Sequence, residues 1–122
     1  MKLTLYWYPN CGTCKKAKKH LDEHQIDYDT VHLVEDTPTA AELQSLIEKS
    51  RLEPKKFFNT SGKAYRENNM KEKLKDADLA EMVTYLASDG MLIKRPIVTD
   101  GKQVTVGYNE ETFNDTWIHE VN

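Results

Sequence analysis

Residues 2–24 read KLTLYWYPNCGTCKKAKKHLDEH, and the periodicity of this stretch changes in the middle. Its first part alternates, with Leu3, Leu5 and Trp7 on one side, which predicts a strand over residues 2–8. A Pro-Asn pair then ends the strand. From residue 11 to residue 24 apolar side chains recur at helical spacing, at Cys14, Ala17 and Leu21. An amphipathic helix is therefore predicted to begin within or just after the pair Cys11 and Cys14.

The next apolar run, Ile26 to Val34, predicts a second strand, so residues 1–37 form a strand–helix–strand unit. Residues 38–90 then favour helices. Capping-box patterns at Thr39 and Asp78, each with a glutamate three residues later, mark two helix starts. Between them Pro54 predicts a short helical turn, and Gly90 is placed where a C-terminal helix cap is expected.

The last segment, residues 91–122, returns to strands. Residues 97–99 and 103–106 flank Asp100-Gly101, which is typical of a short hairpin, and Asn109 predicts the cap of a final short helix. The chain of 122 residues fits one domain. We therefore expect a single α/β domain over residues 1–122: β-α-β (1–37), a helical insertion (38–90) and β-β-α (91–122), with one mixed sheet of four strands.

Composition narrows the possible partners. Seventeen basic and twenty acidic side chains give a net charge of −3, which provides no global attraction for nucleic acid or anionic lipid. No apolar run has the length of a signal peptide or a membrane span. The two cysteines are too few for a secreted disulfide scaffold. We expect a cytoplasmic, monomeric protein with no direct contact to nucleic acid or membrane.

The motif Cys11-Gly12-Thr13-Cys14 follows a predicted strand and opens a predicted helix, which is the setting of redox-active cysteine pairs. Unpaired backbone N–H groups and the helix dipole stabilise a thiolate there. Cys14 shares the apolar stripe of the helix, whereas Cys11 precedes it. We therefore expect Cys11 to be the attacking thiol and Cys14 to be the resolving thiol, with a Cys11–Cys14 disulfide as the oxidised form.

Two other interpretations of the pair stay open, namely inert core cysteines and metal ligands. Cys11, Cys14, His20 and His24 resemble a zinc string, but one rigid helix cannot fold back to bring two such pairs together. We expect no metal site, and we expect His20 and His24 to face solvent. No cofactor is expected to be bound either.

A second feature is the stretch Lys94-Arg95-Pro96-Ile97 before the hairpin. Proline is compatible with the first residue of a strand, and a cis Arg95–Pro96 bond beside the thiols is the functional alternative. Near the thiolate, Arg95 would lower its pKa or hold an anion, whereas a surface salt bridge is the competing role. Asn10, Gly12, Thr13 and Pro96 are expected to contact the substrate.

Four lysines lie on the first predicted helix, at residues 15, 16, 18 and 19. Such a run is commonly a solvated face. The alternative is that it makes the entrance to the thiols positive and attracts an acidic thiol or an acidic protein.

Four stretches together resemble the ArsC/Spx/MgsR family, and they are residues 8–17, 38–43, 92–98 and 106–110. The similarity is greatest to small arsenate-reductase-like and Spx-like proteins of Gram-positive bacteria. It implies a thioredoxin-like fold of the glutaredoxin/ArsC type with a helical insertion, a cis Pro96 and a cytoplasmic thiol-redox role. The reductant implied is a low-molecular-weight thiol or a thioredoxin or glutaredoxin system.

The sequence also departs from both branches of this family. Arsenate reductases carry further arginines where this chain has Asn59 and a residue near Tyr108, and they usually have serine at the position of Cys14. The Spx-type regulators bind the C-terminal domain of the RNA polymerase α subunit, partly through a glycine that aligns with Glu53, and they carry a basic C-terminal extension that the 122 residues lack.

The function expected from the sequence is therefore a cytoplasmic thiol–disulfide oxidoreductase that acts on a thiol or disulfide substrate, rather than an arsenate reductase. The alternative is a redox-switched transcriptional regulator of the Spx/MgsR type, with the RNA polymerase α subunit as its partner.

Overall fold

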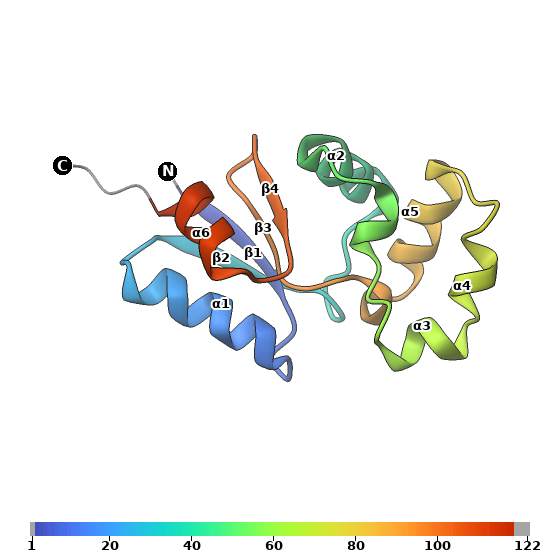
Figure 1. Ribbon diagram of the computed structural model, residues 1–122, viewed down its shortest axis with the longest axis horizontal. Helices are drawn as coiled ribbons and strands as arrows, with labels where there is room; N and C mark the ends of the chain where they lie inside the picture. Colours follow the sequence, from blue (N-terminus) through green and yellow to red (C-terminus); the bar gives the residue numbers. More distant parts are fainter. Residues whose placement is uncertain (1, 119–122) are drawn as a thin grey trace.

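The computed structural model describes residues 2–118, which form one sheet with helices on both faces (Figure 1). The sheet has the order β2-β1-β3-β4. Strand β1 (Leu3–Trp7) pairs in parallel with β2 (Tyr28–His32) and antiparallel with β3 (Ile97–Thr99), and β3 pairs antiparallel with β4 (Val104–Val106). The sheet is therefore mixed and four-stranded, as the sequence predicted.

Helix α1 (Gly12–Glu23) and helix α6 (Glu110–Trp117) cover one face of this sheet. Their apolar side chains pack with Leu3 and Leu5 of β1 and with Val98 of β3. Trp117 also donates a 2.9 Å hydrogen bond from its indole nitrogen to the hydroxyl of Thr105. Leu3, Leu5 and Trp7, which were predicted to share one side of the first strand, thus lie on the face of β1 that packs against α1 and α6.

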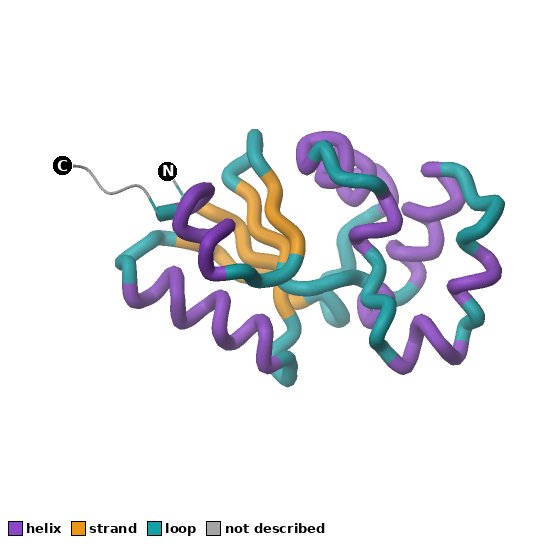
Figure 2. The backbone as a smooth tube through the Cα atoms, viewed as in Figure 1, coloured by secondary structure: helices purple, strands orange, loops and turns teal. Residues whose placement is uncertain are grey.

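The other face is covered by helices from the segment between β2 and β3, which Figure 2 shows as a mainly helical region beside the strands. Helices α2 (Ala40–Ser50) and α5 (Leu79–Ser88) pack there with Ile97 and Val104 of the sheet. Between them lie a short 3-10 helix at Pro54–Phe57 and the short helices α3 (Lys63–Glu67) and α4 (Met70–Lys73). A further 3-10 helix, Gly90–Leu92, leads back toward β3.

The caps account for where several helices begin. Thr39 accepts a hydrogen bond from the backbone N–H of Glu42, and Asp78 and Glu81 form the reciprocal pair of bonds of a capping box. Asn109 caps α6 through the backbone N–H of Thr112 at 3.0 Å. These three starts agree with the sequence prediction.

Strands β1 and β2 are shorter than predicted because the residues that flank them form hydrogen bonds of turns and of a helix end instead of pairing in the sheet. The N–H of Cys11 donates to the carbonyl of Tyr8, which closes a turn after β1. Before β2, Ile26 donates to the carbonyl of Leu21, and so it completes the end of α1 instead of joining the sheet. After β2, the His32 imidazole accepts hydrogen bonds from the backbone of the next turn.

The prediction that Gly90 caps the helix before it is wrong. Helix α5 ends at an extended Asp89, whose carboxylate accepts from the N–H of Met91 and starts the next 3-10 helix. Glycine is needed at residue 90 for space, because a Cβ there would overlap the carbonyl oxygen of Leu33. Gly90 therefore allows the segment after α5 to pack against the chain leaving β2.

Candidate thiol site

The cysteine pair lies where β1 gives way to α1. Cys11 is the N-cap of α1, with extended backbone, and its sulfur accepts a 3.4 Å hydrogen bond from the backbone N–H of Cys14. A sulfur in this position faces the unpaired N–H groups and the positive end of the helix dipole. Both thiols are free. The sequence-predicted helix start is thus within the motif, at Gly12.

The environment of Cys11 favours its thiolate. Partial burial opposes ionisation, but hydrogen bonds from the thiol and the backbone N–H of Cys14, together with the guanidinium of Arg95, outweigh it and lower the pKa of Cys11. The side chain is only partly buried. Cys11 is therefore the thiol that combines a lowered pKa with access to solvent, which are the two properties of a reactive cysteine.

Cys14 has the opposite environment. It is fully buried, at 0% exposure, in the turn of α1 that faces the sheet. Burial raises its pKa to about 12, and its hydrogen bond to Cys11 and the negative charge of the Cys11 thiolate act in the same direction. The two sulfurs are therefore unequal in the sense that the sequence predicted.

Arg95 approaches the site from the segment before β3. Its peptide bond to Pro96 is cis, as the resemblance implied. The guanidinium carbon lies 5.2 Å from the centre of the Tyr8 ring, within cation–π distance. Its Nε and Nη1 atoms are buried, and no described residue accepts a hydrogen bond from either. Arg95 thus retains two unpaired nitrogen donors, and its side chain lines the same pocket as Cys11.

A short antiparallel connection holds this segment in place. Phe58 and Ile93 form an isolated bridge, flanked by hydrogen bonds from Lys94 to the carbonyl of Phe57 and from Asn59 to the carbonyl of Leu92. These bonds bring the end of the first 3-10 helix next to the residues that lead into β3. The helical segment therefore contributes one wall of the site.

A pocket of about 430 Å³ opens above Cys11. Two cations, Lys94 and Arg95, line it, and its described lining includes no carboxylate. The pocket thus combines one activated thiol with local positive charge. The full lining is Cys11, Thr13, Asn59, Ser61, Lys94, Arg95, Val106, Gly107, Tyr108 and Asn109.

The structure brings some of the predicted site residues together and separates others. Cys11, Thr13 and Arg95 line the pocket, and Cys14 is buried within hydrogen-bond distance of Cys11. The remaining three predicted contact residues, Asn10, Gly12 and Pro96, do not line it. Asn10 and Gly12 are exposed outside the pocket, whereas Pro96 is buried and its carbonyl accepts a 2.8 Å hydrogen bond from Gly107.

Sequence reasoning missed Ser61 and the backbone at Gly107 as parts of this pocket. The resemblance had marked Asn59 and a residue near Tyr108, and both positions do line it. Gly107 has a positive φ of 80°, a conformation that favours glycine, and it lies between β4 and α6. A glycine at this place in the sequence was therefore the signal that could have indicated a turn at the rim of the pocket.

The structure favours the solvated-face interpretation of the lysines on helix α1 and corrects the expectation about His20. None of these four lysines lines the pocket, and two of them pair with acids one turn later, Lys18 with Asp22 and Lys19 with Glu23. The positive charge of the pocket comes from Lys94 and Arg95 instead, and of these two Arg95 is the one that lowers the pKa of Cys11. His20 was expected to face solvent, but it is 8% exposed. Its ring nitrogens lie 2.7 Å from the Tyr108 hydroxyl and 2.9 Å from Oδ1 of the Asn114 side chain.

The imidazole of His20 thus joins α1 to Tyr108, at the rim of the pocket, and to α6.

Within residues 2–118, no group of three or more His, Cys, Asp or Glu side chains has the arrangement of a metal site. In the same part of the chain, no helix is both long enough and apolar enough to cross a membrane.

Several proteins are similar to this chain in sequence over most of its length. The chain is 56% identical to YusI of Bacillus subtilis over 96% of its own length and 99% of that protein. It is 32% identical to the global transcriptional regulator Spx 2 of Bacillus cereus, over 88% of this chain and 80% of the regulator. It is 31% identical to the regulatory protein MgsR of Bacillus subtilis, over 88% and 84% of the two chains.

Solved structures agree with this placement. An ArsC family related protein from Bacteroides fragilis matches with a TM-score of 0.90 and 43% identity, over 94% of this chain and 97% of that one. A structure described as a possible arsenate reductase from Streptococcus mutans matches with a TM-score of 0.84 and 43% identity, over 92% and 97%. The ArsC family model matches residues 6–116, and the chain, with its thioredoxin-like sheet and its helical segment, belongs to the ArsC family.

Proposed function

We propose that this protein is a thiol–disulfide oxidoreductase in which Cys11 is the nucleophile and Cys14 the resolving thiol. The observation that supports this most directly is the position of the Cys11 sulfur. It caps the N-terminus of α1, accepts the N–H of Cys14 and opens onto a pocket whose charged residues are cations. Each of these features stabilises a thiolate that a substrate can reach.

The proposed reaction begins when the Cys11 thiolate attacks one sulfur of a substrate disulfide. A bond forms between Cys11 and that sulfur, the substrate S–S bond breaks, and the other sulfur leaves as a thiolate. The Cys14 thiol then loses its proton and attacks the Cys11 sulfur, which releases the second substrate thiolate. The substrate gains two electrons, and the protein is left with a Cys11–Cys14 disulfide.

The lowered pKa of Cys11 and the raised pKa of Cys14 are consistent with this order of events. While Cys11 is a thiolate, its negative charge adds to the burial that keeps Cys14 protonated. Once Cys11 is part of a mixed disulfide, that charge is gone and the pKa of Cys14 falls. Cys14 therefore becomes a nucleophile only after the first step, so an idle Cys14 thiol does not compete for the substrate.

The reaction is completed by a reductant that supplies two electrons to the Cys11–Cys14 disulfide. We propose a low-molecular-weight thiol or a thioredoxin or glutaredoxin system, in the cytoplasm, acting on a monomer. No bound cofactor is part of this scheme. Disulfides are proposed rather than arsenate, because Asn59 and Tyr108 give the pocket neutral groups where the resemblance to arsenate reductases implies arginines.

The test is to trap the first intermediate with a mixed disulfide of glutathione and a chromophoric thiol. Cys14→Ser should accumulate one equivalent of a Cys11-linked adduct, detected by intact mass, and should lose multiple turnover. Cys11→Ser should form no adduct. Mixed-disulfide formation at Cys14 in the Cys11→Ser protein, at the rate found for Cys11, would reverse the assignment.

A second candidate function is a redox-switched regulator that binds the RNA polymerase α subunit. The observation that favours it is the sequence identity of 32% to Spx 2 and of 31% to MgsR over most of the chain. A pull-down with the α C-terminal domain, using the dithiol and disulfide forms of this protein, separates the candidates. Redox-dependent capture without turnover of any disulfide would favour the regulator.

A further inference from the structure

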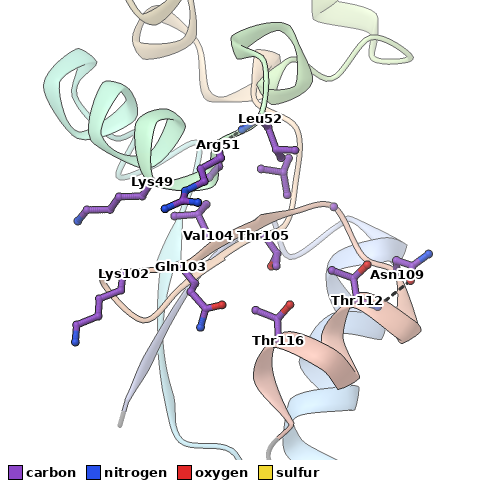
Figure 3. Close-up of a pocket in the computed structure, with 13 residues that line it drawn as sticks. Lys49, Arg51, Leu52, Lys102, Gln103, Val104, Thr105, Asn109, Thr112 and Thr116 are labelled. Atoms are coloured by element: carbon purple, nitrogen blue, oxygen red, sulfur yellow. Dashed lines mark hydrogen bonds between the residues drawn. The ribbon is translucent and has the colours of Figure 1, made fainter.

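A second groove adjoins the thiol pocket and lies along the outer edge of the sheet. Strand β4 is the last strand in the sheet order, so within residues 2–118 one of its two edges has no neighbouring strand. The groove has a volume of about 660 Å³ and is bounded by the C-terminal end of α2, by β4 with its hairpin turn, and by α6. Figure 3 shows Arg51 and Leu52 on the α2 side of the strand and Thr112 and Thr116 on the α6 side.

The hydrogen-bond pattern of the hairpin shows which backbone groups face this groove. Gly107 donates to the carbonyl of Pro96, and the carbonyl of Gln103 accepts from Asp100, so the backbone of residues 103 and 107 faces β3. Backbone direction alternates along a strand, which turns Val104 and Val106 the other way. Their N–H and C=O groups are therefore directed toward the groove, as at the edge of any sheet that can accept another strand.

The charge of the groove is entirely positive. Among the residues that the structure describes, its charged lining residues are Lys49, Arg51 and Lys102, and none of these residues forms an ion pair with another described residue. In a chain of net charge −3, this is a local concentration of unpaired cations. Leu52, with 42% of its surface exposed, adds an apolar contact beside them.

The shape of the groove selects a single strand rather than a second sheet. The end of α2 and helix α6 rise on the two sides of β4, so an approaching sheet would meet them first. A single extended segment fits between them and can place its alternate side chains on the two walls. Residues facing α2 would meet Lys49, Arg51 and Leu52, and those facing α6 would meet threonine hydroxyls. The end of the segment beside the hairpin turn would meet Lys102.

We propose that this groove binds an extended acidic segment of a partner protein, which adds to the sheet as a strand beside β4. Backbone hydrogen bonds to Val104 and Val106 provide the pairing, and carboxylates toward Lys49, Arg51 and Lys102 provide the selectivity. The groove shares Val106, Gly107 and Asn109 with the thiol pocket. Its three cations do not line that pocket, so changing Arg51 and Lys102 tests the proposal without altering the residues around Cys11.

The probe is a fluorescein-labelled, cysteine-free peptide of sequence Thr-Glu-Thr-Leu-Thr-Glu-Thr, titrated into the full chain and followed by fluorescence anisotropy. The double variant Arg51→Glu with Lys102→Glu should weaken binding at least tenfold. Lys71→Glu, which changes an exposed lysine of α4 outside the groove, should change the affinity less than twofold. Disulfide turnover should be unchanged in both.

A second peptide, with every internal amide N-methylated, keeps the charges but cannot donate backbone hydrogen bonds. It should bind at least tenfold more weakly, and the unmodified peptide should slow the amide hydrogen exchange of Val104 and Val106. Equal binding of the two peptides would mean electrostatic adsorption and would overturn the proposal. Absence of binding at millimolar peptide, or tighter binding of a single-stranded oligonucleotide of equal charge, would overturn it too.

Discussion

At the scale of single residues, the reactivity of the site depends on how Arg95 and the start of α1 act on one sulfur. The pKa of Cys11 lies below its ordinary value, so the thiolate fraction, and with it the rate of alkylation, should rise with pH and level off at a lower pH than for a free cysteine. Arg95→Ala should move this curve to higher pH. The measurement is the iodoacetamide rate against pH, read at Cys11 by peptide mass spectrometry.

Lys94→Ala is the matched control for that experiment. Lys94 also lines the pocket, but the pKa of Cys11 is lowered by Arg95 and by Cys14, so this variant should leave the curve in place. Cys14, whose pKa is raised to about 12, should stay unmodified throughout the neutral range. A Cys11 curve that matches free cysteine in both the native chain and Arg95→Ala would contradict the picture of an activated thiol.

Residue by residue, the sequence predicted what depends on local structure. The inequality of Cys11 and Cys14 follows from their positions at one helix start, and both positions are neighbours in sequence. The burial of His20 could not be found in this way, because its partners Tyr108 and Asn114 are about ninety residues away. A histidine with polar neighbours on a helix looks exposed until the packing of α6 against α1 is known.

At the scale of elements, the first residues of the helices were easier to predict than the other boundaries of helices and strands. Thr39, Asp78 and Asn109 cap helices through their own side chains, so the signal lies within four residues. The other boundaries depended on contacts with distant or neighbouring elements. Strand β2 begins at Tyr28 because Ile26 completes the end of α1, and α5 stops before Gly90 because that glycine packs against another part of the chain.

The role of Gly90 gives a prediction about stability. Gly90→Ala would bring a Cβ into the backbone of Leu33, which cannot move aside as a flexible side chain would. We expect a loss of about 1–3 kcal/mol in the free energy of unfolding, measured by urea denaturation.

Gly12→Ala is the control for this prediction, because a Cβ at Gly12 has no atom within 4 Å of it. That variant should keep or slightly raise the stability, since alanine is the better helix former in the first turn of α1. Equal stability of Gly90→Ala and the native chain would show that residue 90 has room, contrary to the close approach described above.

At the scale of the whole molecule, the sheet joins two apolar clusters. One cluster packs α1 and α6 on the sheet through Leu5 and Val98, and the other packs α2 and α5 on it through Ile97 and Val104. Adjacent residues of β3 therefore belong to opposite clusters. The sequence predicted a helical segment between two parts of one sheet, but not which face it covers, because that depends on the pairing of β1 with β3, whose partner residues are more than ninety positions apart.

This arrangement predicts that the chain unfolds as one cooperative unit, with no separate unfolding of the helical segment. Leu86 is fully buried among the helices of that segment, whereas both tryptophans, Trp7 and Trp117, pack in the cluster on the opposite face. Leu86→Ala should cost about 2–5 kcal/mol. If the two clusters are coupled, tryptophan fluorescence and far-ultraviolet circular dichroism should report the same urea midpoint, and both should shift equally. Leu21→Ala, in the tryptophan-bearing cluster, should behave in the same way. A dichroism transition that moves to lower urea in Leu86→Ala while the fluorescence transition stays in place would show instead that the helical segment unfolds by itself.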